Sequence, residues 1–427
     1  MRRTRGKRSR GVYGGGVIRL CLLLLAGLTA AGVFLLVRRE EPPPEPAGID
    51  APVESESPPE PVPEPEPEPE PDPRQETVEA LLRGMSLEEK VGQMFFVRCP
   101  DVGAAETVGQ YSPGGILLFT RDFKDSAGQW LSLEAFMEKI DALQAASSIP
   151  LFIGVDEEGG TVARASRNPN LFPEKFPSPQ QVYSRGAEAD DPFQAGMEQI
   201  RAVETAKNTG LHAYGINVNF APVADVCTEP GDFMYDRAFG QDAEKTARFV
   251  TLVVEEMNSA GVGAVLKHFP GYGSNRDTHD GIAVDERPYE EFAQTDFVPF
   301  RAGIEAGAGA VLVSHNMVMC MDDALPASLS AAVHSVLREE LAFGGVVLTD
   351  DLSMDAVKAY AEDGSLAVLA VQAGNDMLIT SDCASQIPLV VEAVQSGAVE
   401  QALVDAAVTR ILEWKYDLGL LEEQSKG

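Results

Sequence analysis

The stretch Ala264-Val-Leu-Lys267-His268-Phe269 joins an apolar run to two ionisable residues, and similar runs recur along the chain from residue 94 onward. Longer segments of helical character lie between the runs, which is typical of folds whose parallel strands are buried on both faces. The runs predict strands at 94–97, 114–119, 151–156, 216–222, 264–269, 310–315, 346–350 and 377–380. This alternation favours an α/β fold with a single (β/α)8 barrel of the TIM type, and a doubly wound open sheet is the alternative.

Two of the intervening helices carry clear start and stop signals. Asp191-Pro192 predicts a helix that begins with a capping acid and a proline in its first turn, and Gly210 predicts its end. A second helix is predicted from Leu403 to Gly419, because apolar residues recur there at helical spacing.

Ionisable residues stand where four of the predicted strands end: Asp156, Lys267 with His268, His315 and Asp350. The carboxyl ends of the strands form the active face of barrel enzymes. The pattern therefore predicts an active site at that end of the barrel. The alternative is that four strands end in ionisable residues by chance.

Asp350 and Asp351 follow the strand predicted at 346–350, and both are candidates for a carboxylate nucleophile. An aspartate after a strand is, taken alone, more often the N-cap of the next helix. We assign the capping role to Asp351, which leaves Asp350 to face the mouth of the barrel.

The segment from Lys267 to His279 is rich in glycines and polar residues. Asp277 and His279 stand two apart in a predicted loop, and side chains two apart in an extended backbone share a face. The carboxylate can then accept the proton of one ring nitrogen and orient the other nitrogen toward a substrate. An imidazole of ordinary pKa, about 6.5, exchanges protons near neutrality. The motif is weak by itself, because a simple hydrogen bond within the loop is the commoner reason for it.

No metal or cofactor is expected. The five histidines form no helical His-x3-His pair. The four cysteines outside residues 20–37 have no CxxC spacing, and we expect buried free thiols rather than disulfides. These cysteines are Cys99, Cys227, Cys320 and Cys383.

Several separated motifs resemble, in their order along the chain, those of bacterial β-N-acetylglucosaminidases of glycoside hydrolase family 3. The motifs are Val155-Asp156-Glu-Glu-Gly-Gly160, Asn219-Phe-Ala-Pro-Val-Ala-Asp225, Asp236-Arg237-Ala-Phe-Gly240, Lys267-His-Phe-Pro-Gly271, Asp277-Thr-His279 and Thr349-Asp-Asp-Leu-Ser-Met354. The resemblance extends over residues 85–420.

The resemblance implies a barrel that cleaves glycosides in two steps with retention of configuration. Asp350 matches the family's nucleophile, and Asp277 and His279 match its Asp–His acid/base dyad. The positions that match sugar-binding residues would hold hydroxyl groups through charge-assisted hydrogen bonds. They are Asp156, Arg237, Lys267 and His268.

Two features depart from the family pattern. Tyr272 stands where the family usually has a histidine, and the loop 267–279 is one residue shorter than is common. Both lie on the leaving-group side, so they bear on the preferred aglycone more than on the reaction type.

The resemblance also implies a substrate class. We expect an exo-acting enzyme that releases terminal β-linked N-acetylglucosamine from peptidoglycan or chitin-type fragments, muropeptides included. A phosphorylase or another β-glycosidase of the same family is an alternative, since a histidine acid/base tolerates an incoming phosphate that a carboxylate would repel. A non-enzymatic wall-binding barrel is a further alternative, and the intact nucleophile and dyad argue against it.

The N-terminal part predicts export and membrane anchoring. Residues 20–37 are 18 uncharged, mostly apolar residues, long enough to cross a bilayer core of about 30 Å as a helix. Seven basic residues precede this run and two follow it, so 1–19 is predicted to be a cytoplasmic tail and the remainder extracytoplasmic. A cleaved signal peptide is the alternative, and it too exports the domain. The Pro/Glu-rich segment 38–75 predicts a disordered linker, which places the catalytic domain at 76–427.

Composition limits the partners. The formal net charge is −32, and residues 1–39 hold nine of the 34 basic residues and no acid, so the rest is still more acidic. Nucleic acid is therefore disfavoured. The expected partners are the glycan substrate and, through residues 20–37, the membrane, and the catalytic domain is expected to act as a monomer.

Overall fold

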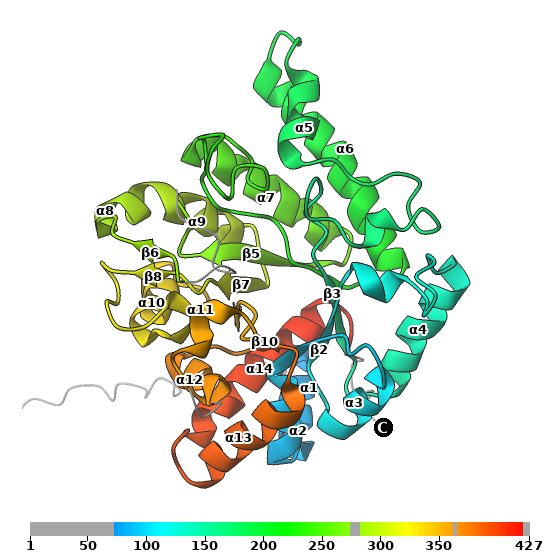
Figure 1. The fold of residues 1–427 in the computed structure, drawn as a ribbon, viewed down its shortest axis with the longest axis vertical. Helices are drawn as coiled ribbons and strands as arrows, with labels where there is room; N and C mark the ends of the chain where they lie inside the picture. The colour runs from blue at the N-terminus through cyan, green and yellow to red at the C-terminus, as the bar shows by residue number, and fades with distance from the viewer. Residues whose placement is uncertain (1–71, 274–281, 362–364, 422–427) are drawn as a thin grey trace, which may run out of the picture. The chain divides into compact units, whose positions relative to one another are not determined.

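Eight parallel strands form the centre of the domain (Figure 1). The computed structural model describes residues 72–273, 282–361 and 365–421. The strands are β1 (Phe95–Arg98), β2 (Gly115–Leu118), β3 (Phe152–Val155), β4 (Val218–Asn219), β5 (Gly263–Phe269), β7 (Ala310–Val313), β9 (Val346–Thr349) and β10 (Leu378–Thr380). Their hydrogen-bonded order is β10-β1-β2-β3-β4-β5-β7-β9. A bridge between Leu348 and Met377 links the two edge strands, so the barrel is nearly closed and the open-sheet alternative is wrong.

Each of the eight predicted strand segments overlaps one barrel strand, so these predictions are confirmed. The segment predicted at 216–222 is the least accurate, because β4 has only two residues. Pro222 has no backbone N–H to donate, and the chain leaves the regular ladder before it. A second, two-stranded parallel sheet was not predicted; it pairs β6 (Val284–Asp285) with β8 (Met317–Val318).

Aromatic side chains pack at the centre of the barrel. The ring centroids of Phe96 and Phe220 are 5.2 Å apart in an edge arrangement, and those of Phe96 and Phe152 are 6.2 Å apart and stacked. Gly154 on β3 makes room for them, since a Cβ there would lie 2.6 Å from the Phe96 ring. The barrel interior is therefore a packed core rather than a channel.

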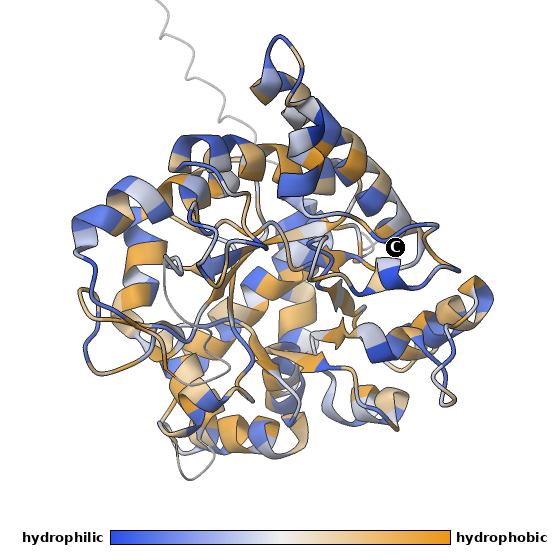
Figure 2. Cartoon of the chain, turned by 45° about the horizontal axis from the view of Figure 1, so that its top comes forward, coloured by the Kyte–Doolittle hydropathy of each residue, from blue (hydrophilic) through white to orange (hydrophobic). Residues whose placement is uncertain are grey.

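Helices surround the strands, and many carry hydrophilic residues on one side and hydrophobic residues on the other (Figure 2). They are α1 (Pro73–Gly84), α2 (Leu87–Gln93), α3 (Ala104–Tyr111), α4 (Leu133–Ala145), α5 (Pro179–Tyr183), α6 (Pro192–Ala213), α7 (Ala243–Ser259), α8 (Tyr289–Glu291), α9 (Phe297–Glu305), α10 (Ala331–Ser335), α11 (Asp355–Lys358), α12 (Leu366–Ala373), α13 (Cys383–Gln395) and α14 (Gln401–Asp417).

The start predicted for α6 is confirmed, because the Asp191 side chain accepts a hydrogen bond from Gln194 N at 3.1 Å. The predicted end at Gly210 is wrong, since the helix continues to Ala213. Gly210 serves packing instead, because a Cβ there would lie 2.4 Å from the Phe172 ring. The helix predicted at 403–419 is α14.

The first helix begins just before the start predicted for the catalytic domain. The linker was expected to end at residue 75, yet α1 begins at Pro73 and the Asp72 side chain caps it by accepting from Arg74 N at 3.0 Å. Arg74 also pairs with Asp417 on α14 at 2.8 Å. The residues described here include no helix of the length and apolarity that a bilayer crossing requires. The span predicted at 20–37, and the linker as far as residue 71, lie outside the described residues.

Candidate active site

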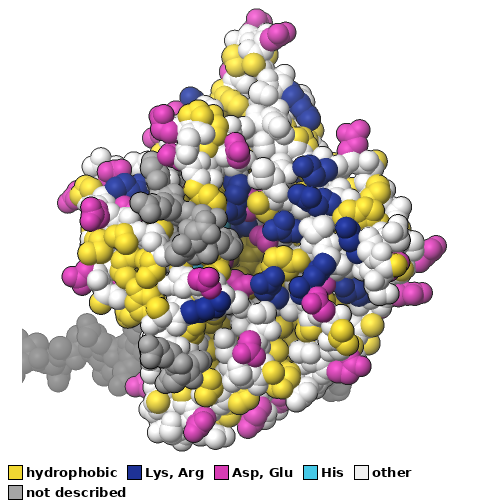
Figure 3. All heavy atoms as spheres, viewed as in Figure 1, with side chains coloured by type: hydrophobic (Ala, Val, Ile, Leu, Met, Phe, Trp, Pro, Cys, Tyr) yellow, Lys and Arg dark blue, Asp and Glu magenta, His cyan; other side chains and the backbone are white. Residues whose placement is uncertain are grey.

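The predicted site residues that the structure describes gather at the carboxyl ends of the barrel strands. Asp156 follows β3, Lys267 and His268 lie near the end of β5, and Asp350 follows β9. Figure 3 shows a hollow in the middle of this view of the molecule, with Lys and Arg side chains around it. Direct contacts join several of these residues across distant parts of the chain.

Lys267 lies between two carboxylates. Its Nζ is 2.7 Å from Asp156 Oδ1 and 2.6 Å from Glu158 Oε1. Glu158 also binds Arg237, with Oε1 2.7 Å from Nη2 and Oε2 3.0 Å from Nε. The side chain of Lys267 is only 3% exposed, whereas those of Asp156 and Arg237 are each 18% exposed. Asp156 and Arg237 are therefore the members of this network that an incoming ligand can reach.

Glu158 is fully ionised at neutral pH. Burial by itself would raise its pKa, but the charges of Arg237 and Lys267 and their hydrogen bonds outweigh burial and hold the pKa well below the ordinary value. Burial likewise opposes the charge of Arg237, and Glu158 and Asp156 together raise the pKa of the guanidinium above its ordinary value. The network therefore presents fixed charges to a ligand.

His268 is oriented by a carboxylate and a guanidinium. Its Nδ1 is 2.8 Å from Asp225 Oδ2, and its Nε2 is 3.3 Å from Arg237 Nη2. A carboxylate can only accept and a guanidinium can only donate, so these neighbours assign the proton to Nδ1 and leave Nε2 as the acceptor. Asp225 lies in a quoted motif, but its role was not predicted, because the contact spans 43 residues of sequence.

Asp350 sits at the tip of β9. Its backbone N donates to Val313 O at 2.9 Å, and its Oδ1 accepts from Asp351 N at 2.8 Å. The predicted capping role of Asp351 is wrong, because α11 begins only at Asp355 and its N-cap is Met354. Asp351 instead accepts from Ser353 N at 2.8 Å, which holds the turn after the strand.

A salt bridge and a buried histidine fix this turn further. Arg98 Nη1 is 3.1 Å from Asp351 Oδ2. His315 Nε2 is 3.0 Å from Asp351 O, and its Nδ1 is 2.7 Å from Ser328 Oγ. His315 was predicted at the active edge and is fully buried there, so it supports the backbone that carries Asp350.

Two arginines near the site were missed by sequence reasoning. The guanidinium carbons of Arg98 and Arg164 lie 4.3 Å and 5.7 Å from the centre of the Phe119 ring. The Nε atom of each is buried and has no hydrogen-bond partner among the described residues. Arg98 directly follows the first predicted strand, 94–97, as other site residues stand at the ends of theirs, so that signal was available. The position of Arg164 depends on Glu157, whose side chain accepts from Arg164 N at 2.8 Å.

The predicted dyad residues Asp277 and His279 lie outside the described residues. The structure gives the chain on either side of them, up to Gly273 and again from Ile282. Within the described parts of the chain, no cluster of three or more His, Cys, Asp or Glu side chains is arranged to hold a metal ion.

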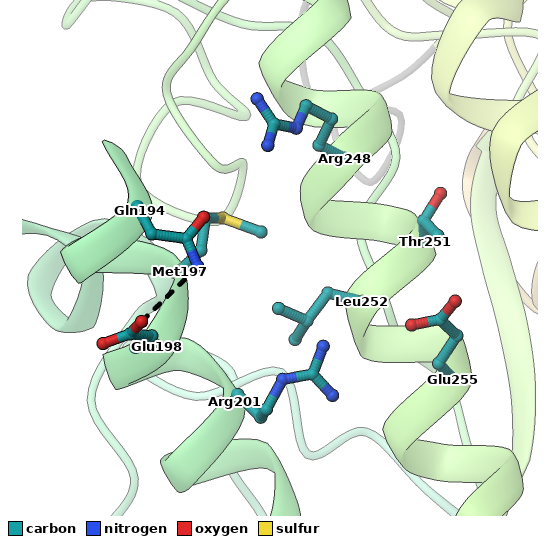
Figure 4. Close-up of a pocket in the computed structure, with 8 residues that line it drawn as sticks. All are labelled: Gln194, Met197, Glu198, Arg201, Arg248, Thr251, Leu252 and Glu255. Carbon is teal, nitrogen blue, oxygen red and sulfur yellow. Dashed lines mark hydrogen bonds between the residues drawn. The ribbon is translucent and has the colours of Figure 1, made fainter. Parts of the chain in front are cut away.

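A separate groove of about 260 Å³ is lined only by residues of α6 and α7. Figure 4 shows the side chains that line it. Met197 and Leu252 contribute its apolar surface, and Arg201 pairs with Glu256. None of the lining residues lies on a strand or in a loop that follows one, so this groove is not part of the site at the strand ends.

A parallel barrel with a network of buried charges at the carboxyl ends of its strands is the architecture of a barrel enzyme. The chain belongs to glycosyl hydrolase family 3, because residues 86–414 match the model of that family's N-terminal domain. It is therefore a glycoside hydrolase.

Relatives agree with this assignment. The chain is 35% identical over 268 residues to a "Beta-hexosaminidase" of Thiobacillus denitrificans, an alignment that covers 62% of this chain and 70% of the relative. A family 3 β-N-acetylglucosaminidase from Paenibacillus sp. str. FPU-7 has a similar structure, with a TM-score of 0.69 and 29% identity over 80% of this chain and 65% of its own. A β-N-acetylhexosaminidase from Beutenbergia cavernae DSM 12333 has a TM-score of 0.65 and 31% identity, over 77% of this chain and 98% of its own.

Proposed function

We propose that this protein is an exo-acting, retaining β-N-acetylglucosaminidase. The observation that carries the proposal is the charged network at the strand ends. Asp156 and Arg237 are accessible there as a charged acceptor and a charged donor for the hydroxyl groups of one sugar, and the buried Lys267 and Glu158 hold them in place. The relatives named β-hexosaminidase and β-N-acetylglucosaminidase support N-acetylglucosamine as that sugar.

In the first step of the proposed reaction, the Asp350 carboxylate attacks the anomeric carbon while the bond to the leaving oxygen breaks. His279 gives its proton to that oxygen, and Asp277 stabilises and orients the imidazole. The product is a glycosyl ester on Asp350. In the second step His279 takes a proton from water, the water oxygen attacks the anomeric carbon, and Asp350 is released as carboxylate. Asp351 N, which donates to Asp350 Oδ1, orients the nucleophile throughout.

The test compares two neighbouring carboxylates on a chromogenic β-N-acetylglucosaminide. Asp350→Asn removes the nucleophile, and we expect kcat to fall by roughly 10⁴-fold or more. Asp351→Asn is the matched control; it weakens the ion pair with Arg98 but leaves the nucleophile, so a loss of about tenfold or less is expected. Equal activity of wild type and Asp350→Asn on every β-sugar tried would contradict the proposal.

The natural substrate is proposed to be a peptidoglycan or chitin-type fragment, and hydrolysis is proposed over phosphorolysis. Assays in phosphate buffer separate the last two reactions, because a phosphorylase releases sugar 1-phosphate and a hydrolase releases the free sugar. A screen of purified wall and chitin fragments, scored for released monosaccharide, identifies the aglycone.

We further propose that the domain is held at the outer face of the cytoplasmic membrane. The support is the sequence of residues 1–75 alone: the basic tail, the apolar run at 20–37 and the Pro/Glu-rich linker. Cell fractionation tests it. The full chain should remain with the membrane after a salt wash, and replacing two leucines of the run with arginine should release it or stop its export.

A further inference from the structure

Three charged residues form a compact group beside the turn that follows β5, and we call Asp285, Arg287 and Asp296 the ion cluster. Arg287 Nη1 is 2.8 Å from Asp296 Oδ2, and Nη2 is 2.8 Å from Asp285 Oδ2. Arg287 Nε is 3.0 Å from the same Asp285 oxygen. The guanidinium carbon also lies 4.2 Å from the centre of the Phe292 ring. The arginine is therefore held from several directions at once.

The two carboxylates of the ion cluster are removed from water. The side chains of Asp285 and Asp296 are 3% and 1% exposed, and that of Arg287 is 21% exposed. Burying charges costs several kcal/mol for each ion, and well-packed apolar residues in their place are often as stable or more so. Stability alone is therefore a poor reason for this arrangement. Multiple guanidinium–carboxylate contacts do fix the relative positions of the groups that make them.

Two glycines bring the turn after β5 directly onto the ion cluster. Gly271 has φ +123°, and a Cβ there would lie 2.1 Å from Asp296 Oδ1. Gly273 has φ +53°, and a Cβ there would lie 2.6 Å from Arg287 Cζ. Only a residue without a side chain allows this approach and these dihedral angles. The backbone path of the turn is thus set by the ion cluster beneath it.

Asp225 holds the same turn from another segment of the chain. Its Oδ1 accepts from Tyr272 N at 2.9 Å, and its Oδ2 accepts from His268 N at 3.2 Å. Asp225 also orients the His268 ring and so belongs to the sugar-binding network, whereas Arg287 pairs with Asp285 and Asp296. Asp225 therefore holds the turn at His268 and Tyr272, and the ion cluster packs against it at Gly271 and Gly273.

We propose that the ion cluster is a positioning device for proton transfer to the leaving group. It fixes the turn at Gly271 and Gly273, and the chain reaches Asp277 and His279 only four and six residues after Gly273. The inference rests on the proposed function, in which His279 is the acid and base. Weakening the ion cluster then impairs protonation of the leaving oxygen more than sugar binding or attack by Asp350.

The test uses the full chain, purified in detergent, and aryl β-N-acetylglucosaminides with different phenols. An acidic phenol such as 2,4-dinitrophenol departs without a proton, while phenol itself needs the general acid, which contributes about 10²–10⁴-fold. For Arg287→Lys and for Asp296→Asn, we expect kcat/KM to stay within about threefold of wild type on the dinitrophenyl glycoside. On the phenyl glycoside we expect a fall of roughly 10²-fold.

A matched control comes from a second buried ion group of the same chemistry. Arg338→Lys weakens the contact of Arg338 with Asp376, next to the strands β9 and β10, and should leave the dependence on the phenol unchanged. Calorimetric binding of N-acetylglucosamine should be the same for wild type and Arg287→Lys. Arg287→Lys keeps the charge and Asp296→Asn keeps the shape of the side chain. If one variant fails to fold, the other still tests the inference.

Two results would overturn the inference: the same fall on every glycoside in both variants, or no fall on any. A wild-type enzyme that cleaves none of the glycosides would instead refute the proposed function. The two failures are therefore told apart by the wild-type measurement alone.

Discussion

The buried charges of the site are stabilised by neighbouring groups of opposite charge, and Glu158 is at the centre of this network. It lies between Lys267 and Arg237, and its pKa is held below the ordinary value although burial opposes this. A carboxylate whose pKa is lower in the folded state stabilises that state above the unfolded pKa of about 4.3. This contribution to stability is lost as the pH falls from about 4.3 through the pKa of the folded state.

Glu158→Gln is predicted to destabilise the protein at pH 7 by about 3–5 kcal/mol, because it leaves the buried Lys267 and Arg237 without their anion. The difference from wild type should shrink as the pH falls below about 4, because the unfolded wild-type chain then binds a proton at Glu158 that the folded chain does not. Urea unfolding of both proteins at pH 7, 5 and 3.5 measures this. A difference that does not change with pH would contradict the assignment of the charge to Glu158.

Individual residues also show which parts of the site could be predicted from the sequence and which could not. Asp156 and Asp350 were predicted as site residues because they stand at strand ends, a signal within a few positions of sequence. The roles of Asp225 and Arg98 depend on contacts with His268 and Asp351, 43 and 253 residues away. Such pairs form only when the barrel closes, so the sequence around each of these residues does not predict its partner.

At the scale of elements, the junction between β9 and β10 is held by a buried aspartate. Asp376 Oδ2 accepts from Val347 N at 2.8 Å and lies 2.5 Å from Arg338 Nη2. Asp376 Oδ1 is 2.7 Å from Arg410 Nη2 on α14. One side chain thus ties the last strands of the barrel to two arginines, next to the bridge between Leu348 and Met377 that joins the strands.

Asp376→Asn should lower the free energy of unfolding by roughly 3–5 kcal/mol, because two partly buried arginines lose their anion. The midpoint of urea unfolding reports the loss, and KM for an aryl substrate should not change, since Asp376 lies away from the sugar-binding residues. Asp355→Asn, in the exposed pair with Lys358, is the control and should leave the midpoint unchanged. Equal midpoints for the two variants would show that Asp376 does not secure the junction.

The elements that were predicted well share one property. The strands β2, β3, β7 and β9 are buried at every position, so each appears in the sequence as an uninterrupted apolar run. The strands β6 and β8 have two residues each, too few to show any period. The strand β4 ends early, before Pro222. The prediction for 216–222 did not take into account that proline has no N–H to donate to the ladder.

The two ends of the barrel differ in function: one carries the active site, and the opposite end contributes to stability. Lys415 lies at the opposite end. It lies on α14, and its Nζ is 2.7 Å from Gln93 Oε1, just before β1, and 5.1 Å from the centre of the Phe152 ring at the start of β3. Lys415 is fully buried, and burial lowers its pKa to about 7. A charge there has no function at the sugar site and acts only on stability.

The direction in which Lys415 changes stability with pH follows from the number of protons bound by the folded and unfolded chains. Between pH 7 and about 10.4, the ordinary pKa of a lysine, the unfolded chain binds a proton at this position that the folded chain does not, so stability rises with pH. In Lys415→Met this contribution is absent. The unfolding free energy of wild type minus that of the variant should therefore increase from pH 7 to pH 10, by up to about 1.4 kcal/mol per pH unit. Urea unfolding of both proteins at pH 7, 8.5 and 10 measures it, and a constant difference would mean that Lys415 stays charged inside the barrel.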